Sequence, residues 1–119
     1  MSEFVRVADL AEIPEGSALK VMVASKPVAV VNTTEGVFAV SDICSHADVS
    51  LAEGDVDGCT IECWLHGSQF DLRTGVPLSP PAFARVDTYE VRLVDVGAST
   101  QVEVATEPQP WNPEERPSA

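Results

Sequence analysis

CSH (44–46) and ECWLHGSQFDLRTG (62–75) are the stretches that decide the fold of this chain. They contain both histidines of the 119-residue sequence and two of its three cysteines, as the pairs Cys44/His46 and Cys63/His66. The full pattern is C-x-H, sixteen intervening residues, and then C-x-x-H. Because thiolate and imidazole are ligands for zinc, iron and iron–sulfur centres, this pairing predicts a metal site in two loops.

The sequence around the two pairs consists of short apolar/polar alternations separated by turn residues, which predicts an all-β domain. One hairpin is expected through Thr34-Glu35-Gly36, between strands at 27–33 and 37–42. Another is expected through 97–99, between strands at 86–97 and 100–106. Further strands are expected at 4–7, 18–24 and 59–61, with a short helical turn near 9–13. The stretch 68–77 reads as a strand followed by a turn at Thr74-Gly75.

The predicted organisation is one domain, 1–106, followed by an extended tail, 107–119, which holds four of the nine prolines. Hydrophobic residues make up 45% of the chain, as expected of a globular protein. We expect a soluble cytoplasmic protein, because no apolar run reaches membrane-spanning length and MSEFVRVADL (1–10) does not read as a signal peptide.

The formal net charge of −12 argues against binding to nucleic acid or to anionic membranes, which would repel the protein. An acidic surface suits brief, electrostatically steered contact with proteins that carry basic patches. The charge taken alone is equally consistent with a role in solubility.

Three interpretations of the two Cys/His pairs compete. The residues could be unrelated, as buried cysteines and surface histidines. They could hold one zinc ion, although zinc motifs usually pair cysteine with cysteine and histidine with histidine. They could hold a two-iron, two-sulfide cluster with two thiolates on one iron and two imidazoles on the other. Two loops that each donate one cysteine and one histidine meet the last demand directly, so we favour the cluster.

The stretch CSH…CWLHGSQFDLRTG resembles the two ligand boxes of Rieske iron–sulfur proteins. The likeness extends to Gly67, to Phe70-Asp71, to Thr74-Gly75 and to VPLSPPA (76–82), which is similar to the proline loop that covers the cluster. It runs to about Thr106. The resemblance implies an antiparallel β-sandwich that carries a cluster-binding subdomain of two ligand loops plus a proline loop. It also implies one [2Fe-2S] cluster, with Cys44, His46, Cys63 and His66 as ligands.

Among Rieske proteins, the chain is similar to the soluble ferredoxins of bacterial aromatic-ring dioxygenase systems. It has no spare histidine for the mononuclear iron of an oxygenase subunit. Val49 and Leu65 stand where the respiratory Rieske proteins have a disulfide between the ligand loops. The resemblance therefore implies an electron carrier, not an enzyme.

The same resemblance implies the partners. The carrier would take single electrons from an NAD(P)H-dependent flavin reductase and pass them to a terminal oxygenase. It would dock transiently at the tip formed by His46 and His66, and we expect a monomer. An accessory role in iron–sulfur cluster assembly stays open, and a zinc-binding module or a small subunit for nitrite reduction is less favoured.

Other residues near the two boxes carry weaker expectations. Cys59 is interpreted as a buried small residue rather than as a reserve ligand or redox thiol. Trp64 and Leu65 either shield the cluster or are ordinary packing residues. Ser68 stands where high-potential Rieske proteins have a hydroxyl donor, whereas Phe70 lacks the hydroxyl of their tyrosine. We therefore expect a reduction potential in the lower part of the Rieske range, which is about −150 to +300 mV.

Overall fold

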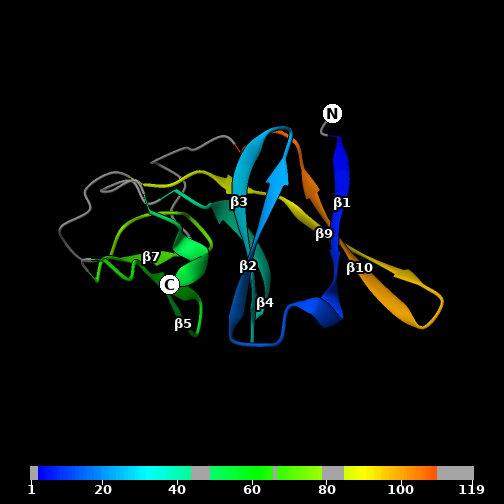
Figure 1. Cartoon of the computed structure of the whole chain (residues 1–119), viewed down its shortest axis with the longest axis horizontal. Coiled ribbons are helices and arrows are strands. Elements are labelled where there is room, and N and C mark those ends of the chain that lie inside the picture. Colours follow the sequence, from blue (N-terminus) through cyan, green and yellow to red (C-terminus); the bar gives the residue numbers. More distant parts are fainter. Residues whose placement is uncertain (1–2, 44–48, 66, 79–84, 110–119) are drawn as a thin grey trace.

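The computed structural model describes residues 3–43, 49–65, 67–78 and 85–109. Within these ranges the chain forms three antiparallel sheets and two short 3₁₀ turns (Figure 1). The strands are β1 (Phe4–Asp9), β2 (Ser17–Val23), β3 (Lys26–Thr33), β4 (Gly36–Ser41), β5 (Asp55–Asp57), β6 (Thr60–Glu62), β7 (Gln69–Asp71), β8 (Thr88–Tyr89), β9 (Val91–Val96) and β10 (Ser99–Ala105). The turns are η1 (Leu10–Glu12) and η2 (Leu51–Glu53).

The sheets stack as three layers (Figure 1). The middle sheet has the order β2-β3-β4-β8, and the sheet β1-β10-β9 covers one of its faces. We call these two sheets the base. The third sheet, β5-β6-β7, packs with η2 against the other face of the middle sheet, and we call it the small-sheet unit.

Strand β3 explains why the middle sheet can serve two cores. Side chains of a strand point alternately to opposite faces. Val28 and Val30 accordingly face the core shared with β1 and β10, whereas Ala29 and Val31 face the core shared with the small-sheet unit. All four are fully buried. This is the pattern of a strand that is covered on both faces, and it reads in the sequence as a continuous apolar run.

Most of the predicted elements are confirmed, but the strand expected at 86–97 is wrong as a single unit. It breaks at Glu90, so that β8 pairs with β4 in the middle sheet and β9 pairs with β10. The predicted common face of Tyr89, Val91 and Leu93 is lost with it, because Tyr89 is buried and Leu93 is 47% exposed. Strand β5 was not expected. Its sequence, Asp-Val-Asp, is too short and too acidic to read as a strand.

The described part of the chain contains no helix that could cross a membrane, since η1 and η2 are three residues long each. Residues 79–82 of the expected proline loop at 76–82, and the tail beyond Gln109, lie outside the described residues. Gln109 itself is held by β8. Its N–H donates to the Thr88 carbonyl at 2.7 Å, and its Oε1 accepts the Thr88 hydroxyl at 3.0 Å.

Candidate metal centre

The second ligand box is the connection between β6 and β7. Cys63 follows β6 directly, and its N–H donates to the Ser68 carbonyl at 2.7 Å. The Gly67 N–H donates to the Cys63 carbonyl at 2.9 Å, which closes the turn. Gly67 has φ +76°, a backbone conformation that residues with a side chain rarely adopt. A Cβ at this position would meet no atom within 4 Å. Glycine is therefore favoured at this position by the backbone conformation rather than by lack of space.

The Cys63 side chain is buried at the start of the second ligand box. The residue is 1% exposed and its thiol forms no disulfide. Ser68 beside it is fully buried, whereas Trp64 and Leu65 are 51% and 42% exposed. Trp64 and Leu65 are thus not ordinary core residues, because about half of each remains open to solvent. The predicted ligand His66 lies outside the described residues.

The first ligand box is the connection between β4 and η2. Ile43 and Ser50 form an isolated antiparallel bridge. Next to it, the carbonyl of Asp42 accepts the Leu51 N–H at 2.6 Å, and Asp42 Oδ1 accepts the Ala52 N–H at 2.9 Å. These contacts close the neck of a loop. The predicted ligands Cys44 and His46 belong to this loop and lie outside the described residues.

One buried cluster lies beneath both ligand boxes. Leu51, just after the first box, and Cys63, at the start of the second, share it with Phe70 and Leu72. The structure therefore brings the bases of the two loops onto a single core, although many residues separate them in the sequence. Val49 also packs against this core, so it is a packing residue where the respiratory Rieske proteins have a cysteine.

The described residues fit a metal cluster at this place. Cys63 offers a buried thiol, and Ser50 Oγ is buried without a hydrogen-bond partner. Such an orphaned hydroxyl is uncommon in a protein interior, and here it stands at the end of the first ligand box. Within the described ranges no three metal-binding side chains gather. This is as expected when three of the four predicted ligands lie outside those ranges.

Cys59 lies in the buried core that also contains Cys63. It is 9% exposed, and its carbonyl accepts the Leu72 N–H at 2.9 Å. Burial raises the pKa of its thiol, and the nearby Arg73 cation only partly offsets this effect. A thiol of this kind is a poor nucleophile at neutral pH. The expected burial of Cys59 is confirmed, and its exclusion from the ligand set stays a prediction.

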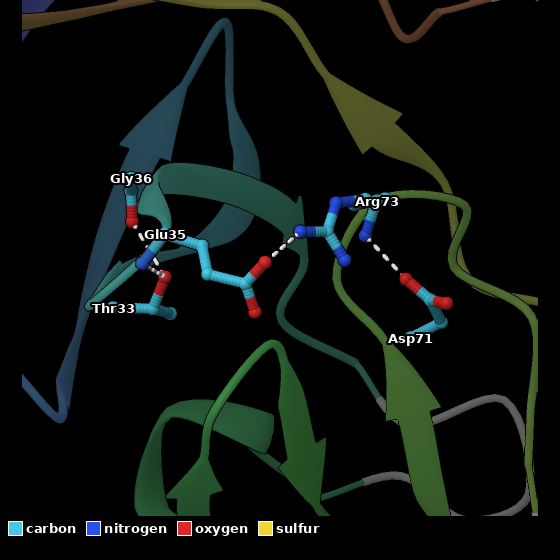
Figure 2. A network of polar contacts seen from close by, with 5 residues as sticks. All are labelled: Thr33, Glu35, Gly36, Asp71 and Arg73. Atoms are coloured by element: carbon cyan, nitrogen blue, oxygen red, sulfur yellow. Dashed lines mark hydrogen bonds and ion pairs between the residues drawn. The ribbon is translucent and has the colours of Figure 1, made fainter. Parts of the chain in front are cut away.

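A polar network connects the small-sheet unit to the base (Figure 2). Arg73, in the turn after β7, forms an ion pair with Glu35 in the β3–β4 hairpin. The Arg73 N–H donates to Asp71 Oδ1 at 2.7 Å, which fixes the turn, and the Glu35 N–H donates to Thr33 Oγ1 at 3.0 Å, which fixes the hairpin. The Arg73 guanidinium also lies 5.9 Å from the centre of the Phe38 ring. The network was not predicted, since no sequence pattern links residues so far apart.

The Rieske [2Fe-2S] domain family matches residues 3–90 of the chain. The chain belongs to the Rieske [2Fe-2S] family. The predicted family and all-β Rieske fold are therefore confirmed, and the cofactor of the protein is a Rieske-type [2Fe-2S] cluster. The assignment of Cys44, His46, Cys63 and His66 as its ligands stays a prediction.

Two Rieske relatives are similar over most of the chain. The biphenyl dioxygenase ferredoxin subunit of Pseudomonas sp. (strain KKS102) is 37% identical over 91 residues, which is 76% of this chain and 84% of the relative. The anthranilate 1,2-dioxygenase ferredoxin subunit of Burkholderia cepacia is 37% identical over 96 residues, which is 80% of this chain and 88% of the relative.

A solved structure gives the same likeness in three dimensions. It is a complex of reduced oxygenase and oxidized ferredoxin in carbazole 1,9a-dioxygenase. The matched chain is 33% identical, with a TM-score of 0.80, and the likeness covers 92% of this chain and 98% of that one.

Proposed function

We propose that this Rieske protein is the ferredoxin component of an aromatic-ring dioxygenase system. It would carry single electrons from an NAD(P)H-dependent flavin reductase to a terminal oxygenase, and it would itself catalyse no reaction. The observation that carries this proposal is the likeness to ferredoxin subunits over 84% and 88% of their own length. We further propose that it works as a monomer in the cytoplasm.

Four residues are proposed to hold the cluster, Cys44 and Cys63 on one iron and His46 and His66 on the other. When bound, the cluster supplies a one-electron redox centre. The burial of Cys63 supports a thiolate pair on the inner side, shielded from water. A cysteine that binds a metal is deprotonated. Burying its thiolate is favourable only when the metal and N–H donors offset the negative charge.

The docking surface is proposed to be the tip that carries His46 and His66. Four large apolar side chains around the ends of the described loops are 42–54% exposed and would form its rim, namely Ile43, Trp64, Leu65 and Leu78. A small apolar contact suits a carrier that must release each partner quickly. The net charge of −12 would favour partners with basic docking surfaces and accelerate their encounter at low salt.

The reduction potential is proposed to lie in the lower part of the Rieske range, about −150 to +300 mV. Hydrogen bonds to the sulfur atoms of a cluster raise its potential. Phe70 is fully buried beneath the second ligand box and carries no hydroxyl that could donate one. A measured potential well above zero would contradict this expectation.

The test of the proposed function begins with the visible absorption and low-temperature EPR spectra of the purified protein, before and after dithionite. We expect a red-brown protein that bleaches on reduction and gives a signal with average g near roughly 1.9. Reduction by a flavin reductase and reoxidation by a dioxygenase oxygenase are then followed by stopped-flow absorbance. A red-brown protein that exchanges electrons with neither would retain the cofactor and refute the dioxygenase role.

A further inference from the structure

Asp42 is an unusual residue for its position. It lies two residues before Cys44 and is 1% exposed. Among the residues that the structure describes, it is the one acidic or basic residue that is buried. Buried carboxylates are rare unless hydrogen bonds compensate for the loss of water. The contacts of Asp42 therefore indicate why it is there.

The described hydrogen bonds of Asp42 fix both ends of the first ligand box. Its N–H donates to the Pro27 carbonyl at 3.1 Å, which ties the start of the loop to β3. Its carbonyl and Oδ1 accept the successive N–H groups of Leu51 and Ala52, which ties the end of the loop. The first N–H groups of a helical turn lack partners within the turn. Asp42 thus satisfies two donors and joins both ends of the loop to the middle sheet.

The second ligand box does not need such a residue. Strands β6 and β7 flank it, and Glu62 pairs with Gln69 at its neck, so a regular hairpin holds its ends together. In the described part of the first box, the neck has the isolated bridge between Ile43 and Ser50 and no pair of regular strands. The buried carboxylate therefore supplies a constraint that strand pairing supplies in the other box.

We propose that Asp42 is the positioning residue of the first ligand pair, and that it acts through the hydrogen bond from the Ala52 N–H to Oδ1. This inference rests on the proposed assignment of Cys44 and His46 as ligands. Without the bond, the two ends of the loop would separate more often, and each opening would expose the metal centre to competing ligands. The inference concerns retention of the cluster, not the path of the electron.

The experiment compares Asp42→Ala, which removes the acceptor, with Asp42→Asn, which keeps an oxygen at the same place. Loss of the visible absorption of the oxidised holoprotein is followed at neutral pH in excess chelator. Removing a buried hydrogen bond to a carboxylate is expected to accelerate cluster loss by about ten- to a hundredfold, whereas Asp42→Asn stays within about threefold of the unaltered protein. Equal rates for the unaltered protein and Asp42→Ala, or equal rates for both variants, would overturn the inference.

A matched control separates positioning from general destabilisation. Asn32, on β3, donates from Nδ2 to the Ile13 carbonyl at 2.7 Å, so Asn32→Ala removes a side-chain hydrogen bond to the backbone away from both ligand boxes. It should lower the urea midpoint but leave the rate of cluster loss unchanged. Cluster loss that accelerates as much in Asn32→Ala as in Asp42→Ala would indicate a global effect and overturn the inference.

Hydrogen exchange of the unaltered holoprotein tests the same contact even if Asp42→Ala cannot be isolated. The segment 49–53 should exchange slowly, because Asp42 accepts two of its amide hydrogens. Exchange of Leu51 and Ala52 at the rate of an open peptide would overturn the inference. A purified protein that is colourless and carries no [2Fe-2S] cluster would instead refute the proposed function, and this inference with it.

Discussion

The base and the small-sheet unit differ in how much of their stability can come from their own strands. In the base, six of the seven strands are six to eight residues long, whereas β5, β6 and β7 have three residues each. A sheet of such short strands buries too little apolar surface to be stable alone. The small-sheet unit borrows one wall of its core from β3 and β4, and the proposed metal ligands would supply further constraint. Removing the cluster should therefore affect the two regions unequally.

The largest effect is expected from Cys63→Ala, which removes a proposed ligand. The visible absorption of the cluster should be lost, and hydrogen exchange should increase in 49–65 and 67–78 while β2, β3 and β10 stay protected, because the base has its own core. Mass spectrometry of the exchanged protein checks this.

Cys59→Ala is the control for Cys63→Ala, since it removes the other described cysteine and should keep the cluster spectrum. Uniform exchange across both regions in Cys63→Ala would show that they unfold together, and the comparison would fail.

A pair of glycines tests how tightly each region is packed. A Cβ on Gly75, in the turn after β7, would lie 2.0 Å from the Val86 carbonyl oxygen, and φ there is +76°. A Cβ on Gly97, in the β9–β10 hairpin, would meet no atom within 4 Å at φ +63°. Gly97→Ala should cost about 1–2 kcal/mol for the left-handed conformation alone. Gly75→Ala should cost clearly more, because the clash adds to the same conformational cost.

Urea unfolding of the two glycine variants checks this prediction through their midpoints. Similar midpoints would mean that the segment around Val86 moves easily, and that the small-sheet unit is less tightly packed than the structure indicates.

Tyr89 reports on the base through its ionisation. Burial raises the pKa of its phenol, and the carboxylates of Asp87 and Glu107 raise it further. The folded pKa thus exceeds the unfolded value of about 10. This group contributes its full stability below pH 10, and that contribution is lost as the pH rises through the folded pKa.

Because the chain has one tyrosine, absorbance at the phenolate band gives the titration directly. The midpoint should lie above that of the urea-unfolded protein. A titration midpoint at or below that of the urea-unfolded protein would contradict the burial of the Tyr89 side chain within the base.

The smallest effect is expected at the ion pair that connects the two regions. Glu35→Gln removes the charge opposite Arg73, yet both side chains are nearly half exposed, so solvent screens their attraction. The variant should change the urea midpoint slightly, and the difference should disappear at high salt. Arg6→Gln, which breaks an exposed pair with Asp9 within the base, is the control. A much larger effect at Glu35 would show that the connection between the regions depends on this contact.

The sequence was sufficient for the features that depend on local pattern. Alternation and turn residues predicted both hairpins. The Cys/His pairs favoured an iron–sulfur cluster, and the resemblance of the stretches around them to Rieske ligand boxes predicted its type. The sequence could not predict that Glu90 divides a regular alternation between two sheets, because alternation shows the faces of a strand and not its neighbours. It also gave no sign that Asp42 is buried. A carboxylate after a strand usually faces solvent, and its partners here were fixed only by tertiary structure.

Strand β3 has a consequence for how the protein tolerates insertions and deletions. Both faces of Val28–Val31 are covered by a core. Removing one residue upstream would shift the register of β3 by one position. Valine side chains would then face the space that Ala29 now fills, and Ala29 would face the core shared with β1 and β10. Such a deletion would disrupt the packing of both cores at once. The position of the small-sheet unit therefore depends on the register of β3, a strand that holds none of the proposed ligands. Sequence length along β3 should consequently be as tightly constrained as the spacing within the ligand boxes.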